Sequence, residues 1–244
     1  MKKLMTAVAI CAVASFSLAQ SVTSANVVGY STKATPAGFL MYSAMFTTVG
    51  GGSATGRLSQ ITGSFDSFDS IQFVDQDGNI PLQYQWIKAG DVPGVSANGW
   101  YDFSNPPNPV DMFLPQGLSY LIATANTNLL TNSGEVRDAA ITINITATGF
   151  TCIGNATPTA RHISSFTFTG LASFDSIQFV DQDGNIPTQY QWIKAGDVPG
   201  VSVNGWYDFS NPPNPVDPVI NSGVGFLLAT SAGATVTIPS PFAP

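Results

Sequence analysis

The chain has 244 residues, a formal net charge of −7 and a charged-residue content of 9%. Soluble domains usually contain about 25% charged residues, so the surface of this protein must be built largely from Ser, Thr, Asn, Gln and Gly. An acidic chain repels nucleic acid and anionic membrane surfaces, and we therefore expect neither as a partner.

The N-terminus has the pattern of a secretory signal peptide. Lys2 and Lys3 precede Leu4–Leu18, an apolar stretch that is too short to span a bilayer, and Ala19 is a small residue of the type that signal peptidase recognises. Residues 1–19 are the predicted signal peptide. We expect the mature protein to be secreted, either extracellular or at the cell surface.

Removal of this leader changes both the charge and the thiol content. Without Lys2 and Lys3, six of the eight basic residues remain against fifteen acidic ones, and the net charge becomes −9. Cys152 is then the only thiol, so a disulfide within the chain is impossible and stability must come from a hydrophobic core. No later segment contains the roughly 18 consecutive apolar residues that a transmembrane helix needs, so we expect no membrane insertion.

A long internal repeat is the most informative feature of the chain. Residues 67–111 return as residues 173–217 with two changes, and weaker similarity continues on both sides. The resulting period of about 105 residues corresponds to a domain or half-domain, not to a turn of a solenoid. We predict a first lobe at residues 20–132 and a second lobe at residues 133–244. The two changes are Thr188 for Leu82 and Val203 for Ala97.

Within each lobe the sequence favours strands. Leu82, Tyr84 and Trp86 alternate with glutamines, which places large apolar groups on one face of a strand. The pairs Asp77-Gly78 and Asn98-Gly99 are typical of hairpin turns. Further strands are predicted at Val27–Thr32, Gly38–Phe46, Ser70–Val74, Leu118–Thr124, Ile141–Thr146, Ser165–Thr169, Val224–Thr230 and Thr235–Pro239, with one helical turn at Arg57–Ile61. The sequence therefore predicts an all-β fold of two tandem β-sandwich or open-barrel-like lobes related by internal duplication.

The duplicated turns carry oxygen-bearing side chains at alternate positions. These are Asp75, Asp77 and Asn79 in the first copy and Asp181, Asp183 and Asn185 in the second. The spacing is similar to the start of a calcium loop, although such a loop needs a bidentate acid at its twelfth position, where this chain has Trp86. Asp and Asn are also common in ordinary β-turns, so the competing interpretation is a turn without any cofactor.

The tryptophans of the chain all lie in the repeats. Trp100, Tyr101 and Asp102 stand beside a proline-rich loop, and their counterparts are Trp206, Tyr207 and Asp208. If these side chains are exposed, they form an aromatic platform with a hydrogen-bonding acid, and a glycan is the expected partner. The competing interpretation is that strand alternation buries these aromatics in the core.

Patterns that would indicate catalysis are weak. Carboxylates for glycoside hydrolysis are available at Asp69, Asp91, Asp102 and Asp111, but their spacing does not single out a pair. His162 is the only histidine, and no nucleophile-elbow motif accompanies it. Cys152 lies in a strand-like segment and is interpreted as a small buried residue. We therefore predict no catalytic residues and no enzyme activity.

An apolar segment at the start of the mature chain predicts self-association. It consists of Asn26, Val27, Val28, Gly29 and Tyr30, and such a strand can pair with an exposed sheet edge of a neighbouring copy. We predict a non-enzymatic secreted structural protein, a self-associating subunit of a surface layer, fibre or extracellular matrix. The alternative is a carbohydrate-binding or calcium-dependent adhesive module, and a secreted hydrolase is a third hypothesis.

Several short motifs together resemble a family of uncharacterised secreted β-rich proteins of Gram-negative bacteria. They are Ala25-Asn26-Val27-Val28-Gly29-Tyr30, Pro36-Ala37-Gly38-Phe39, Gly99-Trp100-Tyr101-Asp102, Gly223-Val224-Gly225-Phe226 and Thr235-Val236-Thr237-Ile238. The resemblance covers nearly all of the mature chain. It implies export and a β fold, and it implies no catalytic residue.

Overall fold

The protein is an all-β molecule, as the sequence predicts. The computed structural model describes residues 28–49 and 55–242. In this part of the chain, helical structure is confined to two short 3-10 turns, η1 at Leu58–Gln60 and η2 at Ile163–Ser165. The remaining regular structure is a set of small antiparallel sheets. Neither described turn has the length or the apolar content that a membrane-spanning helix requires.

The first half of the chain forms three sheets. The largest has the strand order β2-β9-β5-β6-β7, the second has the order β1-β10-β4, and the third pairs β3 with β8. The strands are β1 (Val28–Thr35), β2 (Gly38–Ser43), β3 (Thr55–Arg57), β4 (Ile61–Thr62), β5 (Ser70–Phe73), β6 (Leu82–Ile87), β7 (Gly99–Tyr101), β8 (Phe113–Pro115), β9 (Ser119–Thr124) and β10 (Asn128–Glu135).

The second half has three sheets with strands in the matching order. They are β12-β19-β15-β16-β17, β11-β20-β14 and β13-β18. The register also matches, because Trp86 pairs with Trp100 in the first half and Trp192 pairs with Trp206 in the second. The strands are β11 (Ile141–Ile145), β12 (Gly149–Gly154), β13 (Arg161–His162), β14 (Thr167–Thr169), β15 (Ser176–Phe179), β16 (Thr188–Ile193), β17 (Gly205–Tyr207), β18 (Val219–Ile220), β19 (Gly225–Thr230) and β20 (Ala234–Ile238).

Strand β10 carries the first half beyond the boundary predicted at residue 132. It runs to Glu135 and pairs along its length with β1. Its buried side chains include Asn128 and Asn132 as well as Leu130, so hydrophobic alternation does not reveal the strand. Asn128 links β10 to the neighbouring loop, because its Oδ1 atom accepts the N–H of Ser64 at 2.8 Å.

Each half encloses its own apolar core, which is the main source of its stability. Buried residues of the first core include Leu58, Ile61, Phe65, Ile71 and Leu114. Buried residues of the second core include Ile153, Ile163, Ile177, Phe226 and Val236.

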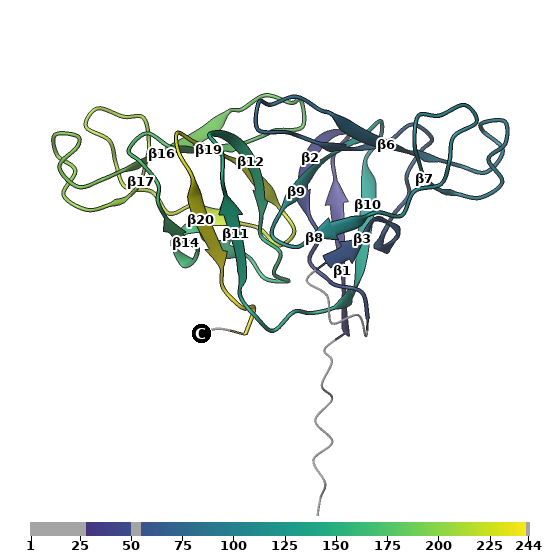
Figure 1. Ribbon diagram of the computed structural model, residues 1–244, viewed down its shortest axis with the longest axis horizontal. Helices are drawn as coiled ribbons and strands as arrows, with labels where there is room; N and C mark the ends of the chain where they lie inside the picture. The colour runs from purple at the N-terminus through teal and green to yellow at the C-terminus, as the bar shows by residue number, and fades with distance from the viewer. Residues whose placement is uncertain (1–27, 50–54, 243–244) are drawn as a thin grey trace, which may run out of the picture.

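The two halves lie side by side and exchange matched hydrogen bonds (Figure 1). The Phe39 N–H donates to the Gln182 carbonyl oxygen at 2.9 Å, and the Phe150 N–H donates to the Gln76 carbonyl oxygen at 2.8 Å. Both glutamines belong to the Asp-Gly turns of the repeats. Each turn therefore packs against the first residues of the large sheet in the opposite half, and the contact is reciprocal.

The connections from β6 to β7 and from β16 to β17 form the two far ends of the molecule (Figure 1). Each connection folds over a small core of its own, which includes the tyrosine of the Trp-Tyr pair. The Tyr101 hydroxyl donates to the Ala97 carbonyl oxygen at 2.8 Å, and the Tyr207 hydroxyl donates to the Val203 carbonyl oxygen at the same distance. The small cores consist of Ile87, Val95 and Tyr101 in the first half and Ile193, Val201 and Tyr207 in the second.

Candidate functional site

The Trp-Tyr pairs of both repeats lie in the interior. Trp100 is 3% exposed and Trp206 is 5% exposed, and Tyr101 and Tyr207 are buried as well. The Trp100 ring contacts the Trp86 ring with centroids 5.4 Å apart, and the second half repeats this contact. These side chains do not present the exposed sugar-binding platform considered from the sequence, because strand pairing turns the large rings into the core.

Asp102 and Asp208 hold the loops that follow the Trp-Tyr pairs. Asp102 Oδ1 accepts the N–H of Ser104 at 3.1 Å and of Asn108 at 2.8 Å, and also accepts the Ser104 hydroxyl. The Ser104 hydroxyl is the main reason that the pKa of Asp102 falls to about 2. The pKa of Asp208 falls to about 2 through the equivalent bond from Ser210. Both carboxylates are therefore engaged by their own loops.

The acidic turns are closed by their own first aspartates. Asp75 Oδ1 accepts the N–H of Asp77 at 3.0 Å and of Asn79 at 2.8 Å, a pattern that is common in β-turns. The equivalent bonds join Asp181 to Asp183 and Asn185. Within residues 28–49 and 55–242, no cluster of three or more His, Cys, Asp or Glu side chains is placed to hold a metal ion. Calcium binding at these turns stays a prediction.

The single histidine lies beside a serine and an aspartate, but the order differs from that of a catalytic triad. His162 Nδ1 is 3.3 Å from Asp217 Oδ2, and the Ser164 hydroxyl donates to the same oxygen at 2.8 Å. The aspartate thus stands between the other two side chains, and the histidine is not the acceptor of the serine proton. Asp217 Oδ1 also accepts the Ser164 N–H at 2.9 Å, so this carboxylate braces η2.

Three of the aspartates considered for hydrolysis also make structural hydrogen bonds. Asp69 is buried, and its Oδ1 accepts the Ala125 N–H at 2.8 Å. Asp91 accepts the Ser67 hydroxyl at 2.6 Å. Asp111 accepts the Ser59 N–H at 2.9 Å and forms an ion pair with Arg57 at 3.2 Å, and so braces η1 as Asp217 braces η2.

Cys152 is buried in β12, as the sequence predicts. Burial raises the pKa of its thiol to about 12, so the thiolate form is strongly disfavoured. Together with Tyr120 and Phe150, it lines a small cavity of about 160 Å³ to which both halves contribute.

The predicted self-association segment lies partly in the described chain. Asn26 and Val27 are outside the described residues. Val28–Tyr30 begin β1 and pair with residues 133–135 of β10 in the same chain. Exchange of this strand between copies would break that pairing, although β1 is the outer strand of its sheet. Self-association through this segment stays a prediction.

Exposed phenylalanines that no sequence-based expectation covers recur in both halves of the molecule. Phe68 and Phe174 are 64% and 62% exposed, and Phe103 and Phe209 are 61% and 59% exposed. Phe103 lies in the connection from β7 to β8, and Phe209 lies in the connection from β17 to β18. We call these connections, together with those from β6 to β7 and from β16 to β17, the end loops. We call these four residues the end aromatics. Polar turn-forming neighbours on both sides of each phenylalanine are the signal that could have identified them.

Hydrogen bonds attach Phe68 and its counterpart to the end loops. The neighbouring Ser67 hydroxyl donates to Asp91 at 2.6 Å and accepts the N–H of Lys88 at 2.9 Å, and both partners lie in the loop that follows β6. Ser173 makes the same two bonds in the second half. Each end therefore combines one end aromatic before β5 or β15 with one after β7 or β17.

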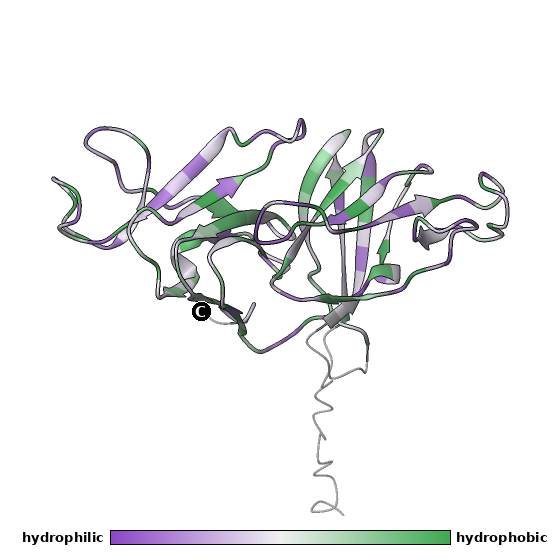
Figure 2. Cartoon of the chain, turned by 45° about the horizontal axis from the view of Figure 1, so that its top comes forward, coloured by the Kyte–Doolittle hydropathy of each residue, from purple (hydrophilic) through white to green (hydrophobic). Residues whose placement is uncertain are grey.

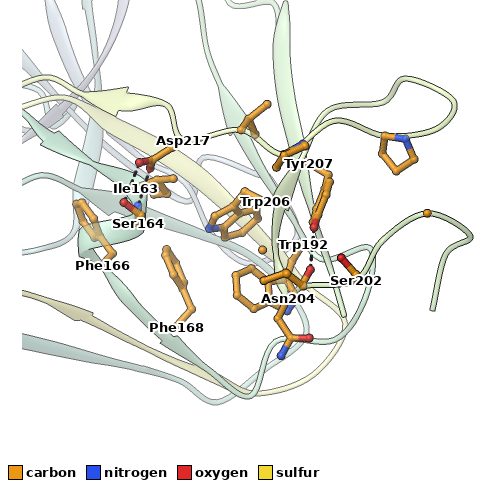
Figure 3. A pocket seen from close by; sticks show the side chains of 16 residues that line it. Ile163, Ser164, Phe166, Phe168, Trp192, Ser202, Asn204, Trp206, Tyr207 and Asp217 are labelled. Carbon is orange, nitrogen blue, oxygen red and sulfur yellow. Dashed lines mark hydrogen bonds between the residues drawn. The ribbon is translucent and has the colours of Figure 1, made fainter. Parts of the chain in front are cut away.

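A cavity of about 610 Å³ opens beside Trp206 in the second half (Figure 3). It lies between η2 and β14 on one side and β17 with the following proline-rich segment on the other. Cavities of about 300–1,000 Å³ are typical of small-molecule sites. Its lining includes Phe166, Phe168, Trp192, Trp206 and Val216, with Ser164, Ser202, Asn204 and Asp217 as polar members.

Searches against protein-family models, curated proteins and solved structures gave no match to this chain. The family resemblance seen in the short motifs therefore stays a prediction.

Proposed function

We propose that this protein is a non-enzymatic, secreted structural protein whose copies associate end to end, as subunits of a fibre, surface layer or extracellular matrix. The observation that carries the proposal is the recurrence of the same two exposed phenylalanines in both halves of one molecule. The loops that carry or contact them form its opposite ends (Figure 1). An enzyme or a carrier has no evident need for two such ends.

The arrangement of the ends favours a linear polymer. The near-identical loops extend in opposite directions from the centre of the molecule (Figure 1), and each loop mixes apolar with polar residues (Figure 2). A surface that recognises the same surface on another copy forms a two-fold contact. Because each molecule has two such surfaces, every new contact leaves one free end, and the assembly continues to grow.

Backbone strain at two of the end aromatics supports the idea that these exposed side chains take part in binding. Phe68 and Phe174 have φ values of 79° and 75°, in the left-handed region that bulky residues rarely adopt. Such a conformation costs about 1–3 kcal/mol and recurs at functional sites. The Phe68 N–H is held by the Trp86 carbonyl oxygen at 2.8 Å, and the Phe174 N–H by that of Trp192 at 2.7 Å.

The energetics favour a weak, concentration-dependent contact. Fully burying one phenylalanine contributes about 1.5–3 kcal/mol. Each end aromatic is about 60% exposed, so the four rings of an end-to-end contact contribute roughly 4–7 kcal/mol. Association costs about 4–15 kcal/mol in lost freedom of motion. We therefore expect polymers at high local concentration, as in a surface layer, and monomers on dilution.

The test replaces the end aromatics one end at a time. Phe68→Gly combined with Phe103→Ser should limit assembly to dimers, because one end remains intact. Adding Phe174→Gly and Phe209→Ser should give monomers at every concentration. Sedimentation velocity across a dilution series and electron microscopy of concentrated samples distinguish these states. The two glycine substitutions relieve backbone strain, so we expect the variants to stay folded, and circular dichroism of each variant checks this.

Phe113→Ser is the matched control, because Phe113 is exposed but lies in β8, away from the end loops (Figure 1). This variant should assemble like the natural chain. A natural chain that stays monomeric at high concentration would reject the proposal, and so would a one-end variant that still forms long polymers.

A bivalent adhesive module is the second candidate, because two equivalent ends can also bridge two copies of an external ligand. In this case, each end binds a polymer such as a glycan and does not bind another copy of this chain. A monomeric natural protein that is retained on a polysaccharide, and released by the four end substitutions, would favour this candidate.

A further inference from the structure

The cavity beside Trp206 is lined by residues that distinguish the second half from the first. Val203 lines it and is one of the two changes within the near-identical block. Phe166 follows η2 at the position where Ile61 follows η1. Phe168 belongs to β14, which is one residue longer than β4. Each of these differences adds apolar surface to the wall of the cavity.

The first half shows that a benzene ring fits against two indoles at the corresponding place. Phe65 lies with its ring centroid 5.2 Å from that of Trp86 and 5.0 Å from that of Trp100. Leu171 precedes the second repeat at the same distance as Phe65 precedes the first. In the described second half, Phe168 takes the corresponding place against Trp206, with ring centroids 5.2 Å apart. Trp192 contacts one other aromatic ring, that of Trp206, and it lines the cavity, so a guest ring can pack against its remaining surface.

The second half also contains a hydrogen-bond donor without an acceptor. The Trp100 Nε1–H donates to the Ile61 carbonyl oxygen at 3.5 Å. Trp206 Nε1 is buried and has no hydrogen-bond partner among the described residues. Buried donors of this kind are rare and call for an explanation. Figure 3 shows the indole nitrogen on the ring edge that faces Phe166 and Phe168.

We infer that this cavity binds a small, uncharged aromatic molecule that carries one hydrogen-bond acceptor, such as an aryl ketone or ester. Its ring packs against Trp192 and Phe168, and its acceptor receives the Trp206 Nε1–H. The aromatic walls supply most of the affinity, and the single donor supplies the orientation.

Charge and polarity exclude other ligand classes. An anionic ligand would meet Asp217 at the edge of the cavity and the net negative charge of the chain. A sugar would bring several hydroxyl groups, each needing a partner once it leaves water. The buried part of the lining offers one free donor, Trp206 Nε1, because the polar lining residues Ser164, Ser202, Asn204 and Asp217 are exposed. A neutral ring with one acceptor matches what the cavity presents.

Two probes of the same shape test the inference on the full natural chain. Benzophenone carries a carbonyl oxygen, and diphenylmethane replaces the carbonyl with a methylene group. Both should bind, and benzophenone should bind about three- to tenfold more tightly, as expected for one hydrogen bond. In ¹H–¹⁵N spectra, benzophenone alone should move the Trp206 indole N–H signal downfield, with the signal assigned from Trp206→Phe.

Variants that make the second half more like the first should remove the site. Phe168→Ala removes one aromatic wall. Leu171→Phe introduces a ring at the sequence position that Phe65 holds in the first half, in the same core cluster as Phe168 and Trp192. Each should weaken both probes at least tenfold, while Ala97→Val in the first half should change neither affinity. The inference fails if neither probe binds up to its solubility limit, if both bind equally, if the indole signal that moves is that of Trp100, or if cellobiose binds more tightly than benzophenone.

Discussion

Corresponding residues of the two halves can differ in charge and in surroundings, as Lys33 shows. Lys33 lies in β1, and its Nζ donates to the Ser222 carbonyl oxygen of the other half at 3.5 Å. The counterpart of Lys33 in the corresponding strand β11 is Ile143, an apolar residue that lies next to Gly117. Burial lowers the pKa of Lys33 to about 8, because the charged amine loses water and gains one carbonyl oxygen in exchange.

We predict that Lys33→Met raises the free energy of unfolding at pH 7 by about 1–2 kcal/mol, a value already reduced for the partial exposure of the side chain. Methionine keeps the length of the side chain and removes the buried charge. The folded pKa is lower than the unfolded one, so the penalty is fully present below pH 8 and disappears as the pH rises from about 8 to about 10.5.

Denaturant unfolding of the natural chain and the variant at pH 7, 9 and 10.5 measures this difference. The gap in stability should narrow steadily with pH. Lys194→Met is the control, because Lys194 is exposed and its replacement should change stability little at any pH. A gap that widens with pH would contradict the proposed burial of charge.

At the scale of elements, local patterns predict most strands but not their tertiary partners. The alternation of large residues in Leu82–Ile87 correctly predicts β6, because that face packs on a core. Strand β7 ends at Tyr101, where the Asp102 carboxylate closes a loop. The Asp-Gly turns are correctly predicted as turns, yet nothing in their residues indicates that their Gln76 and Gln182 carbonyl groups bind the opposite half.

Each of these turns packs against a glycine of the opposite half, where a larger residue has no room. Gly149 has a φ of 110°, and a Cβ atom added there would overlap the Gln76 carbonyl oxygen. Gly149→Ala should therefore lower stability by more than 2 kcal/mol, from backbone strain together with displacement of the turn. Gly90→Ala is the matched control, because Gly90 has a φ of 88° but no atom within 4 Å of an added Cβ.

Thermal or denaturant unfolding of both variants separates the two contributions. Gly90→Ala should show the strain alone, at about 1 kcal/mol. Equal losses in the two variants would mean that the contact between the turn and the opposite half contributes little.

At the scale of the molecule, the two halves meet through complementary small residues. Ser43 ends β2 and Gly154 ends β12, and a Cβ atom added at Gly154 would overlap the Ser43 side chain. Ser119 begins β9 and Gly225 begins β19, and a Cβ atom added at Gly225 would overlap the Ser119 side chain. The first half thus supplies serine at each position where the second half supplies glycine.

The repeat in the sequence predicts two similar halves, but not which faces meet. The serine and glycine positions lie outside the near-identical block and look like ordinary strand residues. For the candidate site, burial of the tryptophans was one of the interpretations that the sequence left open. The φ values of Phe68 and Phe174 depend on tertiary hydrogen bonds, so the sequence carries no direct signal for them.

Exchanging the serine and the glycine of one such pair, Ser119 and Gly225, tests in the full chain whether the two residues contact each other directly. Gly225→Ser should lower stability by about 1–3 kcal/mol, because the second hydroxymethyl group has no room beside Ser119. Adding Ser119→Gly should recover most of the lost stability. The recovery is not complete, because the Ser119 hydroxyl of the natural chain donates a hydrogen bond to the Ile153 carbonyl oxygen at 3.0 Å, which the double variant lacks. Recovery by a second substitution is the signature of direct contact.

Gly205→Ser controls for the effect of serine in place of a strand glycine, since an added Cβ there meets only the Tyr207 ring at 3.6 Å. This variant should lose less than 1 kcal/mol. If Ser119→Gly fails to rescue Gly225→Ser, the loss arises within the second half. A rescue would instead mean that the fixed pairing of serine with glycine helps to select the side-by-side arrangement that directs the two end loops outward.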